Sequence, residues 1–239
     1  MAVNNNFHVL KTGFFSSILL SFITLITFAL AMTAIPISGP WCQANCIEYP
    51  YHNSLQNYPH DYYWMFLAMV QLIIYIVFMI SLHYVTSAER KMFSFTAVAF
   101  ALLSALLLMA DYFIQFAVVP VSLMMGETEG IALLTQYNPH GIFIAMEELG
   151  YLLMSLSFFC LLPVFHGKNG LERTLRWLLA LPFILNLLAL VTITAKFGIV
   201  REYWFEIITI SINWLFILAL GVLVARLFKM KMREAKQSS

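Results

Sequence analysis

Three carboxylic acids, Asp111, Glu147 and Glu148, stand inside stretches of sequence that are otherwise apolar enough to cross a lipid bilayer. A carboxyl group at that depth costs about 2.5–3.5 kcal/mol by insertion scales, so such groups usually face a binding site or a path. No Lys or Arg is expected at the same depth. The acids should therefore be protonated, hydrated or bound to something positive, which makes them candidates for proton transfer or cation recognition.

Other polar side chains fall at a similar depth when helices are counted at about 1.5 Å per residue from their outer ends. Asp111 and Gln115 share one helix face, and Tyr151 lies four residues after Glu147 and three after Glu148, within reach of either carboxyl. Amides from three further helices join this layer. The predicted ligand-binding or proton-coupling residues are Asp111, Glu147, Glu148, Gln71, Gln115, Asn186, Asn213, His140 and Tyr151.

Glu147 and Glu148 are adjacent in the chain, so they point about 100° apart around a helix and cannot share one face. His140 falls two turns before Glu147 on the same face, which favours Glu147 as the residue inside the bundle. Glu206 is expected only about 5 Å below the outer surface, where water can reach it.

The amides have a simpler alternative role. Asn, Gln, Ser and Thr in membrane helices often only join neighbouring helices, at about 0.6 kcal/mol per contact. Gln71, Asn186 and Asn213 could each act in this way. The acids lack so ordinary an explanation, so the functional hypothesis depends mainly on them.

Six apolar stretches must position these residues, each long enough for the helix of about 20 residues that a bilayer requires. Of the 239 residues, 62% are hydrophobic and 10% are charged, whereas soluble domains have about 25% charged residues. We expect an all-α integral membrane protein, a six-transmembrane-helix bundle that forms one domain over 1–239. The predicted spans are 13–35, 62–85, 92–119, 140–165, 175–195 and 203–226.

Lys and Arg residues set the expected orientation, because cytoplasmic loops carry an excess of both. Only Lys196 and Arg201 fall on one side of the predicted spans. The opposite side includes both termini, which should therefore be cytoplasmic in the plasma membrane of a prokaryotic cell. The basic residues on that side are Lys11, Arg90, Lys91, Lys168, Arg173, Arg176, Arg226, Lys229, Lys231, Arg233 and Lys236.

The longest connection, 36–61, should lie outside the cell and is rich in aromatic residues, so it could fold as a lid over the polar layer. Cys42 and Cys46 would then face an oxidising compartment, and a short disulfide is the simplest prediction. A catalytic redox pair is the alternative, although the spacing differs from that of the usual two-residue motif.

We expect no metal, cofactor or nucleic acid. His60, Asp61 and His140 could meet near the outer surface, but they come from separate elements without the spacing of a metal motif. The net charge is +1, and no Gly-rich phosphate loop occurs. The expected partners are the lipid bilayer and a small-molecule or lipid-like ligand. The oligomeric state is left open.

Three functions fit these residues. The first is a cavity in the outer half of the bilayer, lined by the acids and amides, that binds or transports a small cationic or amphiphilic molecule, with or without protons. The second is an intramembrane enzyme that runs acid–base chemistry on a lipid-like substrate. The third is a structural or accessory membrane protein without chemistry, which predicts a filled bundle. Whether the chain is an enzyme stays open at this point.

Overall fold

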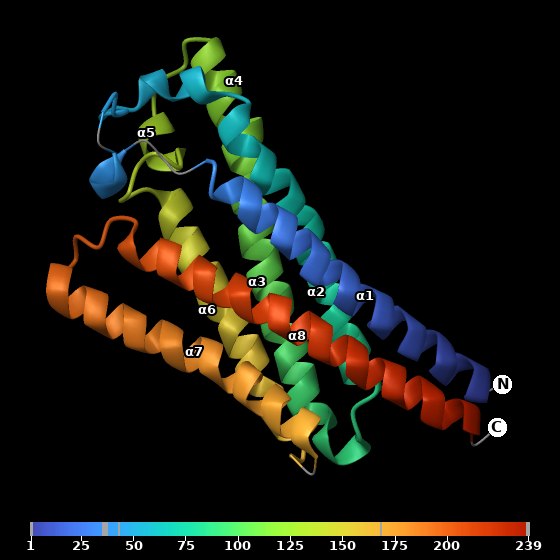
Figure 1. Cartoon of the computed structure of the whole chain (residues 1–239). Helices are drawn as coiled ribbons and strands as arrows, with labels where there is room; N and C mark the ends of the chain where they lie inside the picture. Colours follow the sequence, from blue (N-terminus) through green and yellow to red (C-terminus); the bar gives the residue numbers. More distant parts are fainter. Residues whose placement is uncertain (1, 35–37, 43, 168, 238–239) are drawn as a thin grey trace.

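The computed structural model describes residues 2–34, 38–42, 44–167 and 169–237, and within these ranges the chain forms helices and loops without a strand (Figure 1). Six helices are long and apolar enough to cross a membrane, which confirms that part of the sequence prediction. The predicted junction between the first span and the outer loop, at 35–37, lies outside the described residues, as does Lys168.

The six long helices are α1 (Ala2–Ala31), α2 (Tyr63–Tyr84), α3 (Lys91–Ala117), α6 (Ile142–Cys160), α7 (Gly170–Phe197) and α8 (Trp204–Gln237). Two short helices, α4 (Val119–Met124) and α5 (Ile131–Leu134), lie between α3 and α6. Short 3-10 helices occupy Gly39–Trp41, His52–Asn57, His60–Tyr62, Ala88–Arg90 and Leu162–Val164.

Helix α8 continues well past the predicted end of the last span at 226. Phe228 is fully buried and packs so closely on Gly13 of α1 that a Cβ at that glycine would overlap its ring. Contact with α1 therefore holds the basic tail in the helix. Sequence hydropathy could not reveal this, because the tail itself is polar.

Helices α1 and α8 pack closely along much of their length. The Ser21 hydroxyl donates to the Leu218 carbonyl at 3.0 Å, and a Cβ at Gly221 would lie 2.5 Å from the Ser17 carbonyl oxygen. In Figure 1 the two helices run together from the N and C ends and lie further apart at their opposite ends. Gly221 thus allows a close approach near the middle of both helices.

Helices α3 and α6 form a second close pair. The Ser104 hydroxyl donates to the Gly150 carbonyl at 2.7 Å, and a Cβ at Gly150 would meet the Leu108 side chain. Because the two helices are antiparallel, this register places the residues after Leu108 opposite those before Gly150. It thereby brings Asp111 and Tyr112 toward Glu147.

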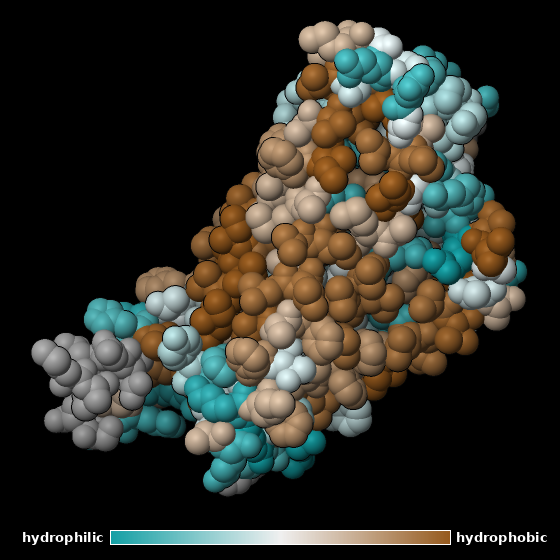
Figure 2. All heavy atoms as spheres, turned by 180° about the vertical axis from the view of Figure 1, so that it is seen from behind, coloured by the Kyte–Doolittle hydropathy of each residue, from teal (hydrophilic) through white to brown (hydrophobic). Residues whose placement is uncertain are grey.

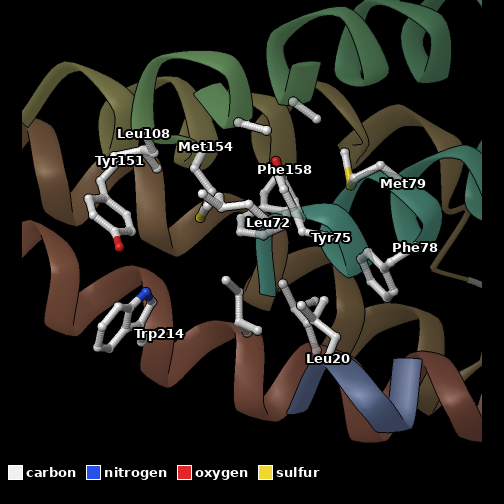
Figure 3. Close-up of a cluster of buried hydrophobic side chains, with 14 of the residues drawn as sticks. Leu20, Leu72, Tyr75, Phe78, Met79, Leu108, Tyr151, Met154, Phe158 and Trp214 are labelled. Atoms are coloured by element: carbon white, nitrogen blue, oxygen red, sulfur yellow. The ribbon is translucent and has the colours of Figure 1, made fainter. Parts of the chain in front are cut away.

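The core and the outer surface are both apolar, as expected of a protein in lipid. Figure 3 shows aliphatic, sulfur-containing and aromatic side chains of several helices packed together inside the bundle, and Tyr75 forms a hydrogen bond with Ser157 within it. Figure 2 shows a broad apolar surface between two hydrophilic ends. Large exposed side chains such as Phe22, Leu106 and Val191 contribute to the apolar surface.

Candidate functional site

A cluster of acidic and aromatic side chains lies inside the bundle, where α3, α6 and α8 meet. Tyr112 of α3 donates its hydroxyl hydrogen to Oε1 of Glu147 of α6 at 2.7 Å. Glu147 is fully buried, and the carboxyl group of Glu206 of α8 lies against it. Asp111 of α3 is close enough for its charge to act on both glutamates. Carboxyl groups from three helices thus interact electrostatically inside the bundle.

The hydrogen bonds of this cluster have a single direction. The one hydroxyl hydrogen of Tyr112 goes to Glu147, so the 2.9 Å bond between the two tyrosine hydroxyls must be donated by Tyr151. The indole nitrogen of Trp214, which can only donate, is directed at the Tyr151 hydroxyl (Figure 3). Each group therefore donates to the next one: Trp214 to Tyr151, Tyr151 to Tyr112, and Tyr112 to the Glu147 carboxyl.

The direction of these hydrogen bonds distinguishes Glu147 from Glu206. Two adjacent buried carboxyl groups cannot both carry charge unless a cation or a proton offsets it. Because Glu147 already receives a donor, Glu206 is the partner left to hold a proton or to meet a positive group. Within the described part of the chain, Oε2 of each glutamate and Oδ2 of Asp111 have no hydrogen-bond partner. Such orphaned buried oxygens are uncommon in folded proteins and call for an explanation.

A pocket of about 230 Å³ opens beside this cluster, between the last turn of α1 and the first turns of α8. Its wall is apolar apart from Glu206, Gln136 and Ser211. Trp214 also belongs to the wall, so the pocket and the hydrogen-bonded cluster share two residues of α8. Met32, which directly follows α1 and is 59% exposed, marks the side on which the pocket reaches the surface of the molecule.

The predicted amides are all buried, but they do not form one wall. Asn213 donates to the carbonyls of Tyr151 and Thr209, at 3.2 and 2.8 Å, so it joins α8 to α6. Gln115 accepts a hydrogen bond from the Gln136 backbone at 3.1 Å and ties α3 to the loop between α5 and α6. Oε1 of Gln71 and both side-chain polar atoms of Asn186 lack a partner among the described residues.

The expectation that no cation reaches the acids is wrong for Glu148. Arg201, in the loop before α8, donates from Nη2 to Oε2 of Glu148 at 2.7 Å. Arg201 was placed on the outer side of the spans, but its long side chain reaches down to α6. Glu148 is therefore an ion-pair partner at the edge of the bundle, whereas Glu147 faces its interior.

His140 is not brought to the acids. Its backbone N–H donates to the Asn138 side chain at 2.9 Å in a turn, so α6 begins only at Ile142, and His140 is exposed. The face shared with Glu147 on an ideal helix does not exist here, because the helix starts later.

The lining of the pocket also differs from the prediction. None of the predicted residues belongs to its wall, whose one acid is Glu206. Sequence reasoning missed Glu206, Tyr112, Trp214 and Gln136. Glu206 shares a helix face with Thr209 and Asn213, and this polar stripe was the signal that could have identified it.

The loops at the end of the bundle opposite the two termini form a cap over it (Figure 1). Tyr137, fully buried, donates to Oδ2 of Asp61 at 2.6 Å, and Tyr203 donates to the Gln136 carbonyl at 3.1 Å. Burial raises the pKa of Tyr137 well above its ordinary value, and the hydrogen bond to Asp61 raises it further. Cys42 and Cys46 are joined by a disulfide in the same cap.

Metal ligation has no support in the described ranges, where no group of three or more His, Cys, Asp and Glu side chains is placed to hold an ion. His60 instead pairs with its neighbour Asp61 at 3.0 Å.

The fold and this site define an all-helical, multi-pass membrane protein with a buried acid cluster beside an apolar pocket. Comparison with protein-family models, with curated proteins and with solved structures gave no match. The function must therefore be argued from the site alone.

Proposed function

We propose that the protein binds an amphiphilic molecule, with the apolar part in the pocket between α1 and α8 and a positive or hydrogen-bonding group at Glu206. The observation that carries this proposal is the wall of the pocket, which is apolar except where it meets Glu206, Gln136 and Ser211. Binding sites for small amphiphiles combine an apolar wall with a few placed polar groups in this way.

The route of entry that fits best is sideways from the membrane. Met32, just after α1, is exposed, and Ile207 and Ile210 of α8 are partly exposed in the wall of the pocket. The neighbouring surfaces of α1 and α8 also carry exposed apolar side chains. Above the pocket, Gln136 and the capping loops cover the outer end. A molecule dissolved in the outer half of the bilayer would thus meet the opening directly.

The polar group of the ligand is best matched by an amine. Glu206 has an unpartnered Oε2 and lies against Glu147, so a cation there would offset the repulsion between the two carboxyl groups. An alcohol or amide could donate to the same oxygen, but it would leave that repulsion in place. We therefore expect an alkylamine to bind more tightly than an alcohol of equal length.

The experiment titrates the full chain in nanodiscs with dodecylamine and with dodecanol, and follows the thermal unfolding temperature. Dodecylamine should stabilise the protein saturably, and Glu206→Gln should raise the half-saturating concentration by about tenfold, as expected for loss of a hydrogen bond to a charged group. Glu129→Gln, at an exposed acid of the outer loop, is the matched control. Equal titration curves for the wild type and Glu206→Gln would refute the proposal.

A second candidate function is acid–base chemistry on a lipid-like substrate. It is favoured by the contact between the carboxyl groups of Glu147 and Glu206, since a proton held by this pair could be given to a molecule at Glu206 and returned to the pair. Incubation with a membrane lipid extract separates the candidates. An enzyme converts a lipid, and Glu147→Gln stops the conversion. A binding protein leaves all lipid masses unchanged, and a transporter moves its ligand across vesicles.

Both termini would be cytoplasmic, with the chain as one domain in the plasma membrane of a prokaryotic cell. Support comes from the many Lys and Arg residues at the end that holds both termini, which Figure 1 places at one end of the bundle. A green fluorescent protein fused after Ser239 should fluoresce, whereas alkaline phosphatase at the same position should be inactive. The opposite pattern would reverse the orientation.

A further inference from the structure

A separate basic site lies at the other end of the bundle, around His166 in the connection between α6 and α7. Two adjacent pockets of about 380 and 320 Å³ share the side chains of His166 and Arg176. Arg90 belongs to the wall of the first pocket and Arg173 to that of the second. Three guanidinium groups from two segments far apart in the sequence thus surround one histidine.

One of these arginines is held in place by the loop, and a second lies close to it. Arg90 donates to the Pro163 carbonyl and, from Nη2, to Nδ1 of His166 at 2.8 Å. Because arginine can only donate, Nδ1 must accept, and a neutral His166 carries its hydrogen on Nε2 as a further donor. Arg176 lies over Gly167, where a Cβ would be 3.6 Å from its Nη1.

The second pocket has an apolar side as well as a basic one. Leu162, Trp177 and Ala180 belong to its wall, and Trp177 is 62% exposed on α7. Tryptophan in this position is typical of the level of the lipid headgroups. Glu89 is the one acidic residue in the walls of the two pockets, so its negative charge does not offset the positive charges of the three arginines.

We propose that this site binds the headgroup phosphate of an anionic phospholipid, with an acyl chain along Trp177 and Ala180. Guanidinium groups bind phosphate oxygens in pairs, and basic pockets at the cytoplasmic ends of membrane helices take such headgroups. A free phosphate shares this chemistry but has no apolar part to place against the apolar wall, so the lipid is favoured. The site is independent of the amphiphile pocket and of the function proposed for it.

Native mass spectrometry of the full chain tests this inference, with phosphatidylglycerol, phosphatidylcholine and inorganic phosphate as separate probes. We expect phosphatidylglycerol to bind preferentially, and Arg173→Gln/Arg176→Gln to weaken it by about fivefold for each arginine removed. Both arginines are exposed, so this variant should fold. Lys229→Gln/Arg233→Gln, at two exposed basic residues of α8 outside both pockets, is the matched control.

Three results would overturn the proposal. The first is an equal loss of phosphatidylglycerol binding in the control variant, which would indicate non-specific attraction by positive charge. The second is equal binding of phosphatidylcholine. The third is occupation of the site by inorganic phosphate with no preference for the lipid, which would make it a site for a free anion.

Discussion

The Tyr112 hydroxyl lies 2.7 Å from Oε1 of Glu147 and joins α3 to α6 inside the bundle. Tyr112→Phe removes this donor and leaves a buried carboxyl oxygen without a partner. We expect a loss of about 1–3 kcal/mol in the free energy of unfolding, measured by denaturant unfolding in micelles. Tyr63→Phe, at an exposed tyrosine of α2, should change it little. Equal stability of the two variants would mean that the bond contributes nothing.

The ion pair between Arg201 and Glu148 should be visible in a double-mutant cycle. The Glu148 side chain is 12% exposed and that of Arg201 is 32% exposed, so solvent screens the pair only partly. Arg201→Gln should destabilise the protein more than Arg201→Gln/Glu148→Gln does, because the single change leaves a buried acid unpaired. A coupling energy of about 1–2 kcal/mol is expected. A value near zero would show that solvent screens the ion pair, as it does for pairs on the surface.

Gly221 should not tolerate a side chain. A Cβ there would overlap the Ser21 hydroxyl and press on the Ser17 carbonyl, so Gly221→Ala must push α1 away from α8. Overpacking of this kind costs about 1–3 kcal/mol, which thermal unfolding would detect. Gly170→Ala is the comparison, since no atom lies within 4 Å of the added methyl group. If both variants unfold at one temperature, the close approach of the helices is wrong.

The stability of the cap should fall at high pH. Burial raises the pKa of Tyr137, so the folded protein keeps a proton that the unfolded chain releases above pH of about 10. Each such tyrosine lowers the free energy of unfolding by about 1.4 kcal/mol per pH unit in that range. Tyr137→Phe should therefore give a shallower decline above pH of about 10, whereas Tyr49→Phe, at an exposed tyrosine, should not. An unchanged slope in Tyr137→Phe would contradict the buried bond to Asp61.

Hydropathy and helical periodicity predicted the six spans, because a long apolar run in lipid has few alternatives to a helix. The ends of the helices were harder to predict from the sequence. The start of α6 depends on the Asn138 side chain, and the continuation of α8 past 226 is supported by Phe228 packing against α1. Both are tertiary or side-chain effects that no hydropathy pattern contains.

Counting depth along each helix identified Asp111 and Glu147, because a lone acid in an apolar run is conspicuous. It failed for Tyr112 and Trp214, since an aromatic residue in a membrane helix looks the same whether it faces lipid or a carboxyl group. It also failed for Arg201, whose reach to Glu148 depends on the path of a loop. The partners of the acids, rather than the acids themselves, were therefore the part of the site that needed the structure.

The central claim is that the pocket between α1 and α8 holds the apolar part of a ligand, and filling the pocket tests it most directly. Ala31→Trp places an indole in the wall of this pocket, whereas Leu25→Trp, at a residue of α1 that is 56% exposed, adds the same group at the outer surface. In the dodecylamine titration, we predict that Ala31→Trp abolishes the saturable rise in unfolding temperature and that Leu25→Trp retains it. Retention of the full rise in Ala31→Trp would contradict the account.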